Sequence, residues 1–170
     1  VPAFTWVSTA NVVLYCGATP VFADVDAQTN NIDPESIKAK LSNNTKAVIV
    51  VHLFGLCADM DAINAVLPDS VVVLEDAACA SGASYKGKMA GGLGDAASFS
   101  FHPRKIITTG EGGMVTTRNP ELAERMMCLR NHGASISEEQ RHNGPKPYIL
   151  PEFAELGFNY RMTDMQGAIG

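Results

Sequence analysis

The sequence predicts an α/β fold with a mostly parallel sheet flanked by helices. Two segments, 47–51 and 71–74, consist almost entirely of Ala, Val, Ile and Leu, which is typical of strands that are covered on both faces. Segments with helix signals alternate with the strands, as is typical of a parallel sheet with helices on both faces. Ligands of such sheets bind at the carboxyl ends of strands, so His52, Asp76 and residues 102–105 are candidates for a site.

The other elements are predicted from helix caps and from short apolar runs. At Asp33-Pro34-Glu35 the Asp caps free N–H groups, Pro suits the first helical position and Glu favours the positive end of the helix. That helix is expected to end near Leu41. Thr163 and Gln166 form a capping box, which predicts a helix there. Further helices are expected over 7–15, 60–67 and 119–131, further strands over 20–25, 97–101 and 113–117, and a long surface loop over 133–149.

Composition and charge are those of an ordinary soluble domain. Of the 170 residues, 46% are hydrophobic and the formal net charge is -5, so we expect neither nucleic acid nor an anionic membrane as a partner. Without a leader or an apolar run near the ~20 residues of a membrane helix, the protein is expected to be cytoplasmic. The cysteines have no metal-site spacing, so no metal is expected and all four are predicted to be reduced thiols: Cys16, Cys57, Cys79 and Cys128.

Lys105 is the candidate nucleophile. Its neighbours in the chain include Phe99, Phe101, Ile106 and Ile107, which indicates an apolar surrounding. Desolvation disfavours the ammonium form and leaves more free amine to attack a carbonyl. The alternative is a solvated surface charge, which is the ordinary state of a lysine.

Three neighbouring features suggest a binding site, and each has a simpler alternative. Asp76 ends an apolar strand, where it either serves a ligand or caps a helix. The Gly-rich segment 110–113 either binds a phosphate through backbone N–H groups or only turns between two strands. Ser100, five positions before Lys105, either donates to a phosphate or is an ordinary strand serine.

Taken together, these segments resemble the DegT/DnrJ/EryC1/StrS family of pyridoxal-phosphate-dependent sugar aminotransferases of fold type I. The resemblance covers nearly the whole chain and includes EDAACASGASYKGK and SFSFHPRKIITTGEGGMVTT. The matching segments are 2–26, 31–37, 52–63, 75–88, 98–117, 129–134 and 156–170.

The resemblance implies roles for individual residues. Lys105 would attach covalently to the aldehyde of pyridoxal phosphate and later move a proton. Asp76 would pair with the protonated pyridine nitrogen, and Ser100 would donate to the phosphate. Trp6 would stack on the cofactor ring, with plain core packing as the alternative. Asn159 would reach the phosphate in the neighbouring subunit, so that a homodimer shares its active sites.

Two further positions stay open, and one departs from the family pattern. Arg161 is either a structural neighbour or part of the same anion site, and His102 either fills space or takes part in catalysis. Cys79 stands where many members have a glutamine near the cofactor ring, and a thiol is a poor hydrogen-bond partner. The cofactor is therefore tuned differently here, or another group takes over the contact.

The resemblance also implies an extent and an activity. Residues 1–170 are expected to be the central part of the large pyridoxal-phosphate-binding domain, without the N-terminal Gly-Thr segment or the small C-terminal domain. The expected reaction moves an amino group from glutamate or glutamine to a keto group of a nucleotide-linked sugar, for polysaccharide or glycoconjugate biosynthesis. The alternatives are a sugar dehydratase with the same cofactor and a non-catalytic module that binds pyridoxal phosphate or phosphate. Lys105 argues against the dehydratase, because some of those relatives have a histidine in its place, and Lys105 together with Asp76 argues against the binding module.

Overall fold

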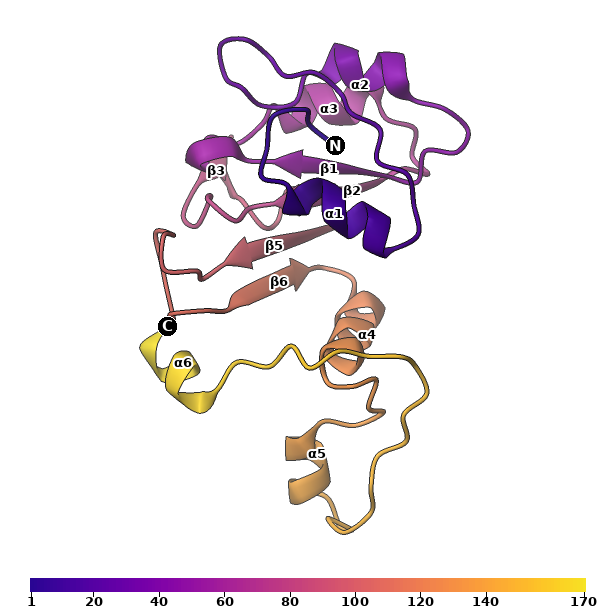
Figure 1. The fold of residues 1–170 in the computed structure, drawn as a ribbon, viewed down its shortest axis with the longest axis vertical. Helices are drawn as coiled ribbons and strands as arrows, with labels where there is room; N and C mark the ends of the chain where they lie inside the picture. The colour runs from indigo at the N-terminus through magenta and orange to yellow at the C-terminus, as the bar shows by residue number, and fades with distance from the viewer. The chain divides into compact units, whose positions relative to one another are not determined.

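A four-stranded sheet in the order β1-β2-β5-β6 is the centre of the first of two units of this chain (Figure 1). The computed structural model describes residues 1–170, apart from the side chain of Glu138. The first unit comprises Val1–Thr117 with Gly170, and the second comprises Arg118–Ile169. The strands of the large sheet are β1 (Ala47–Val51), β2 (Val72–Asp76), β5 (Ala96–Ser100) and β6 (Gly113–Thr117).

The helices and the small sheet complete the two units. The first unit also contains α1 (Ser8–Tyr15), α2 (Pro34–Lys40), a 3-10 turn (Leu53–Gly55), α3 (Met60–Val66), and a hairpin of β3 (Ser84–Tyr85) and β4 (Lys88–Met89). The second unit contains α4 (Pro120–Arg130), α5 (Glu138–Asn143) and α6 (Asp164–Ile169). No helix in the described part of the chain is long and apolar enough to cross a membrane.

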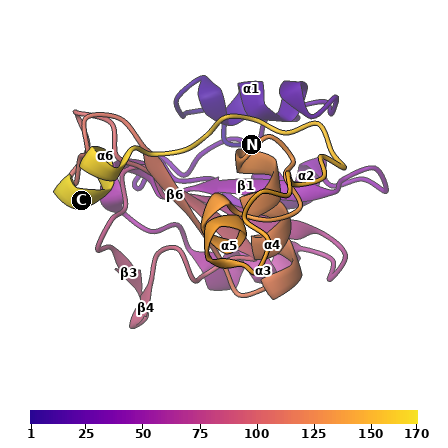
Figure 2. The same cartoon turned by 90° about the horizontal axis from the view of Figure 1, so that it is seen from below.

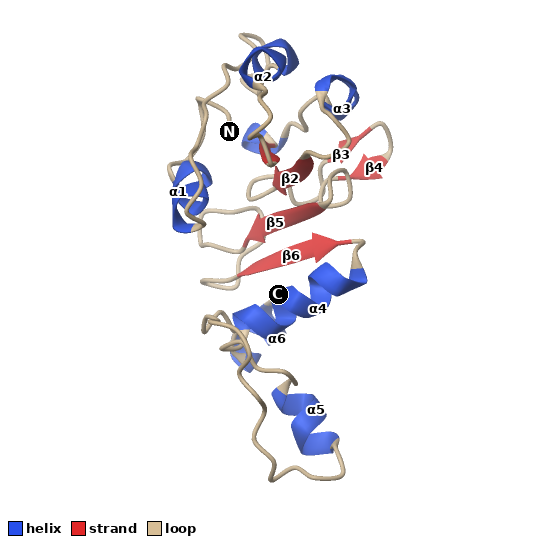
Figure 3. Cartoon of the chain, turned by 90° about the vertical axis from the view of Figure 1, so that its right-hand side faces the viewer, coloured by secondary structure: helices blue, strands red, loops and turns tan.

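The two faces of the sheet have different neighbours, because successive side chains of a strand point to opposite faces. Val50 of β1 and Val73 of β2 are buried in one core with Ile37 of α2 and Ile63 of α3. Figures 2 and 3 show α1 on one side of the sheet and α3 on the other. Burial of each such side chain stabilises the fold by roughly 1.5–3 kcal/mol. The predicted α/β fold with helices on both faces is therefore confirmed.

Local signals account for most of the element boundaries. The Asp33 side chain accepts from the N–H of Glu35 at 3.0 Å, as the predicted cap requires. The capping box of Thr163 and Gln166 is also formed, and α6 begins at Asp164, directly after Thr163. The same kind of box, between Ser137 and Gln140, starts α5 inside the segment predicted as a loop. The prediction of a loop over this segment is wrong, although the sequence contains the signal for the helix, Ser-x-x-Gln.

The prediction of a strand over 20–25 needs correction, and the mostly parallel sheet contains one antiparallel pair. Residues 20–25 form no strand; Ala23 and Val25 make only isolated bridges, to Pro2 and Ile32. In addition, β6 pairs antiparallel with β5, while β1, β2 and β5 are parallel. The physical reason is the connection: residues 101–112 contain no helix, and a parallel crossover needs a longer path, usually helical. The sheet is thus mostly parallel with one antiparallel edge strand.

The buried Glu75 carboxylate accepts hydrogen bonds from His52 and from the loop that precedes β5. His52 Nε2 lies 2.9 Å from Glu75 Oε2, and both side chains are fully buried. Because the N–H of Ala58 donates to His52 Nδ1 at 3.2 Å, the ring hydrogen lies on Nε2 and is donated to Glu75. Three loop N–H groups also donate to the Glu75 carboxylate at 2.7–2.8 Å: Gly91, Leu93 and Gly94.

Replacement of Glu75 is expected to destabilise the protein in a pH-dependent way. Burial alone would raise the pKa of Glu75. The hydrogen bonds from His52 and from the three N–H groups together lower it by more than burial raises it, so the pKa lies below the ordinary 4.5. The carboxylate therefore stabilises the fold above pH 4.5, and this contribution is lost as the pH falls through the lowered pKa. We expect Glu75→Gln to lower the free energy of unfolding by about 3 kcal/mol at pH 7. The NH₂ group of glutamine is itself a donor and cannot accept from the buried donors that surround it.

Urea unfolding of the full-length protein and the Glu75→Gln variant between pH 7 and pH 3 measures this difference. The difference in the free energy of unfolding between the wild type and the variant is expected to become smaller as the pH falls. A gap that stayed constant across this range would contradict the assignment of an ionised Glu75.

Candidate active site

A hollow of about 880 Å³ lies between α1 and the neighbouring sheet face of the first unit. Its walls come from α1 and the segment before it, from the ends of β1, β2 and β5, and from the loop between β5 and β6. The volume is within the range of roughly 300–1,000 Å³ that is usual for small-molecule sites. Five predicted site residues line this hollow: Trp6, Asp76, Cys79, Ser100 and Lys105.

Lys105 reaches the hollow from the loop between β5 and β6. Its N–H donates to the carbonyl of His102 at 2.9 Å, so the residue lies in a tight turn. Its Nζ donates to Cys79 Sγ at 3.1 Å. Of its four predicted apolar neighbours, Ile106 and Ile107 are exposed in this chain, whereas Phe99 and Phe101 are half-buried and Phe99 lines the hollow.

The loop that carries Lys105 is fixed by a threonine that the sequence reasoning missed. Thr109 is buried, its N–H donates to the carbonyl of Phe101, and its hydroxyl donates to the carbonyl of Glu111 at 2.8 Å. The N–H of Phe101 in turn donates to the carbonyl of Gly112. In these contacts the Gly-rich segment turns between β5 and β6, the simpler of its two predicted roles.

The Asp76 carboxylate ends β2 and is held on both oxygens. Oδ1 accepts from the N–H of Ala78 at 3.2 Å, and Oδ2 accepts from the hydroxyl of Thr9 at 2.9 Å. Asp76 also pairs with Val51 of β1 and with Ser98 of β5 in the parallel register. The strands therefore place this carboxylate at the same sheet edge as the start of the Lys105 loop, as predicted for ligand sites of this fold.

Ser100 and His102 form the beginning of the Lys105 loop. The Ser100 hydroxyl accepts from the N–H of His102 at 3.3 Å, which leaves the hydroxyl hydrogen to donate to a ligand. His102 Nδ1 accepts from the N–H of Arg104 at 3.2 Å, and Nε2 lies 3.9 Å from a carboxylate oxygen of Glu111. His102 thus helps to shape the turn, in addition to lining the hollow.

Trp6 lies just before α1, with 70% of its surface exposed. Such exposure does not fit core packing, which was the alternative for this residue. Its indole instead forms part of the wall of the hollow. An exposed aromatic ring on a ligand-sized hollow is available to contact a planar ligand.

Asn159 and Arg161 belong to the second unit. Asn159 is exposed and its backbone forms an isolated bridge with Asn131. Arg161 Nη1 donates to the side-chain oxygen of Asn131 at 2.7 Å, so this arginine has a structural partner within its own unit. Phe158 and Tyr160 stack with their ring centroids 4.9 Å apart on either side of Asn159 in the chain.

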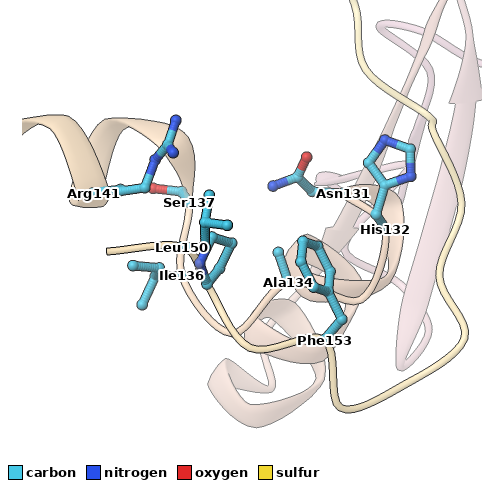
Figure 4. Close-up of a pocket in the computed structure, with 9 residues that line it drawn as sticks. Asn131, His132, Ala134, Ile136, Ser137, Arg141, Leu150 and Phe153 are labelled. Carbon is cyan, nitrogen blue, oxygen red and sulfur yellow. The ribbon is translucent and has the colours of Figure 1, made fainter. Parts of the chain in front are cut away.

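The second unit has a small hollow of its own, of about 160 Å³ (Figure 4). Phe153 and Ala134, which are joined by an isolated bridge, line it together with His132 and with Arg141 of α5. It is smaller than the roughly 300 Å³ at which ligand pockets usually begin. The larger hollow of the first unit is therefore the candidate active site.

The donor set of the larger hollow fits pyridoxal phosphate. A lysine amine can attach to an aldehyde, a carboxylate can pair with a protonated ring nitrogen, and a hydroxyl can donate to a phosphate. Lys105, Asp76 and Ser100 supply these groups on one hollow, and Trp6 adds an aromatic surface. This combination is more than a simple phosphate-binding site requires.

Comparison with known proteins gives a consistent family. The model of the DegT/DnrJ/EryC1/StrS aminotransferase family matches residues 1–170. The GDP-perosamine synthase of Caulobacter vibrioides is 47% identical over 171 residues, which cover 100% of this chain and 43% of that protein.

Solved structures agree with the sequence comparison. An aminotransferase from Psychrobacter cryohalolentis has a TM-score of 0.91 and 42% identity, over 99% of this chain and 43% of its own. A putative sugar aminotransferase from Streptococcus pneumoniae in its PLP form has a TM-score of 0.87 and 29% identity, over 99% of this chain and 46% of its own. The chain thus spans less than half the length of these proteins.

Proposed function

The chain belongs to the DegT/DnrJ/EryC1/StrS aminotransferase family, and on that premise we propose that it forms the core of a pyridoxal-phosphate-dependent sugar aminotransferase. The reaction would move an amino group from glutamate or glutamine to a keto group of a nucleotide-linked sugar. The observation that carries this proposal is the placement of Lys105, Asp76, Ser100 and Trp6 on one hollow. The names of similar proteins, a GDP-perosamine synthase and a sugar aminotransferase, support the class of substrate.

Each side chain has a separate task in this proposal. Pyridoxal phosphate, when bound, would supply an electron sink for the negative charge that develops on the amino-bearing carbon when that carbon loses its proton. Lys105 holds the cofactor through its amine, gives way to the substrate amine, and then moves a proton between carbon atoms. Asp76 keeps the proton on the pyridine nitrogen, because a nearby carboxylate favours the charged ring. Ser100 donates to the phosphate and Trp6 covers the ring.

Cys79 would act on the lysine. Its sulfur accepts from Lys105 Nζ at 3.1 Å, which points the amine toward a defined place on the wall of the hollow. Because a thiol is a weak acceptor, this contact orients the amine without holding it as a charged group would. The amine is therefore easily released when it has to attack or to carry a proton.

A visible spectrum tests the proposed function. The full-length protein mixed with pyridoxal phosphate is expected to turn yellow, and glutamate is expected to bleach the colour as the amino group enters the cofactor. A nucleotide-linked keto sugar should then restore the colour. A yellow protein that no amino donor bleaches would instead support the non-catalytic binding module.

We propose in addition that two copies of the chain share their active sites and that the protein acts in the cytoplasm. The resemblance assigns the phosphate contact to Asn159 of the partner subunit. Asn159 is exposed and its backbone is held by Asn131, which supports a role outside its own unit's core. The four cysteines are free thiols, in keeping with a reducing compartment.

Mixing two defective variants is expected to restore activity if the sites are shared. A dimer of Lys105→Ala with Asn159→Ala would have one site with both defects and one site with neither. Random exchange would therefore recover about a quarter of the wild-type sites. Activity of the mixture is measured after subunit exchange, with each variant alone as control. No recovery, in a mixture shown to contain mixed dimers, would contradict a shared site.

A further inference from the structure

Thr9 is a buried hydroxyl on the wall of the hollow, and nothing in the proposed roles accounts for it. It is 3% exposed and is the buried residue of α1. Burying a hydroxyl costs free energy unless it is hydrogen-bonded, and an apolar residue would pack at this position at no such cost. The buried hydroxyl of Thr9 therefore needs a hydrogen-bond partner that offsets the cost of its desolvation.

The partner is the Asp76 carboxylate. Thr9 Oγ1 lies 2.9 Å from Asp76 Oδ2 and 3.0 Å from Thr5 Oγ1. A hydroxyl has one hydrogen and an ionised carboxylate has none, so Thr9 donates to Asp76. Thr5 must then donate to Thr9. The three side chains form a hydrogen-bonded chain with one direction, from Thr5 through Thr9 to Asp76.

This chain leaves Asp76 with a fixed orientation. Its other oxygen accepts from the N–H of Ala78 at 3.2 Å, so the carboxylate is held from α1 on one side and from its own turn on the other. Each oxygen keeps a further lone pair for a ligand in the hollow that both Thr9 and Asp76 line. Without Thr9 the carboxylate would be held on one oxygen only.

We propose that Thr9 is a positioning residue that aims the Asp76 carboxylate at the ring nitrogen of the cofactor, with Thr5 orienting the Thr9 hydroxyl. The inference rests on the proposed function, because Asp76 acts there through that nitrogen. Thr9 itself touches no reacting atom; it acts by fixing the direction and distance at which Asp76 meets the ring.

Substitutions at Thr9 in the full-length protein loaded with pyridoxal phosphate test this inference. Thr9→Val removes the hydroxyl and keeps the shape, and we expect the rate of the glutamate half-reaction to fall about 10- to 100-fold, the range for one lost hydrogen bond to a charged group. The KM for glutamate should change little, and the absorption spectrum of the bound cofactor should shift. Thr9→Ser keeps the hydroxyl and should stay within about threefold of wild type.

A double variant separates positioning from packing. In an Asp76→Ala background, Thr9→Val should have almost no further effect on the spectrum or the rate, because the acceptor through which Thr9 acts is absent. Thr9→Ala, which leaves no atom in place of the hydroxyl, replaces Thr9→Val if that variant does not fold. Equal losses for Thr9→Ser and Thr9→Val, or a full additive loss in the Asp76→Ala background, would overturn the inference.

The proposed function and this inference fail in different ways. If the wild-type protein neither turns yellow with pyridoxal phosphate nor reacts with glutamate, the proposed function fails. If the wild type reacts and Thr9→Val has the same rate and spectrum, only the role of Thr9 fails.

Discussion

Lys105→Ala is expected to abolish transamination, with a loss of at least about 10⁴-fold in kcat. The variant has no amine to attach to the cofactor aldehyde and no group at this place to move the proton. Pyridoxal phosphate should still enter the hollow, because Asp76, Ser100 and Trp6 remain on its walls. The measurement is the rate of the glutamate half-reaction, followed by absorbance in single-turnover conditions.

Lys105→Arg is the matched control for charge. It keeps a cation near Cys79, but a guanidinium does not attach to the aldehyde. We expect it to be as inactive as Lys105→Ala. Activity of Lys105→Arg within tenfold of wild type would show that the charge of Lys105 matters and its nucleophilic amine does not.

Asp76→Ala is expected to have the second largest effect, a loss of about 10³-fold in kcat with the covalent attachment to Lys105 retained. The carboxylate pairs with the protonated ring nitrogen in the proposed mechanism, and without it the ring withdraws electrons less effectively. Thr9 would also lose the acceptor of its buried hydroxyl. The spectrum of the bound cofactor and the rate with glutamate are measured on the same sample.

Asp76→Glu is a control that keeps the negative charge but moves the carboxylate away from its position. It keeps the carboxylate but lengthens the side chain, so it should recover part of the lost rate and less than the wild-type value. An Asp76→Ala protein with wild-type kcat would contradict the role of this carboxylate, whatever the state of Lys105.

The sequence was sufficient to predict the elements that depend on local signals. The cap at Asp33 and the capping box at Thr163 each use side chains within a few residues of each other, and both are formed. The apolar runs at 47–51 and 71–74 mark β1 and most of β2. Because these strands run parallel, the placement of Asp76 at a sheet edge followed from the fold alone.

Features that depend on distant parts of the chain were not predictable in this way. The contact between Thr9 and Asp76 spans 67 positions, and no local pattern marks Thr9 as the partner of a carboxylate. The buried pair of His52 and Glu75 is likewise separated by 23 positions. Residues 20–25 have strand-like composition, yet they lack a neighbouring strand to complete a ladder.

The central claim is that Lys105 carries the cofactor, and chemical trapping tests it most directly. The full-length protein loaded with pyridoxal phosphate is reduced with borohydride, digested, and mapped by mass spectrometry. The account predicts that the pyridoxyl phosphate mass lies on the peptide that contains Lys105 and that Lys105→Ala lacks it. Trapping at another lysine, or no trapping in a protein that still transaminates, would contradict the account.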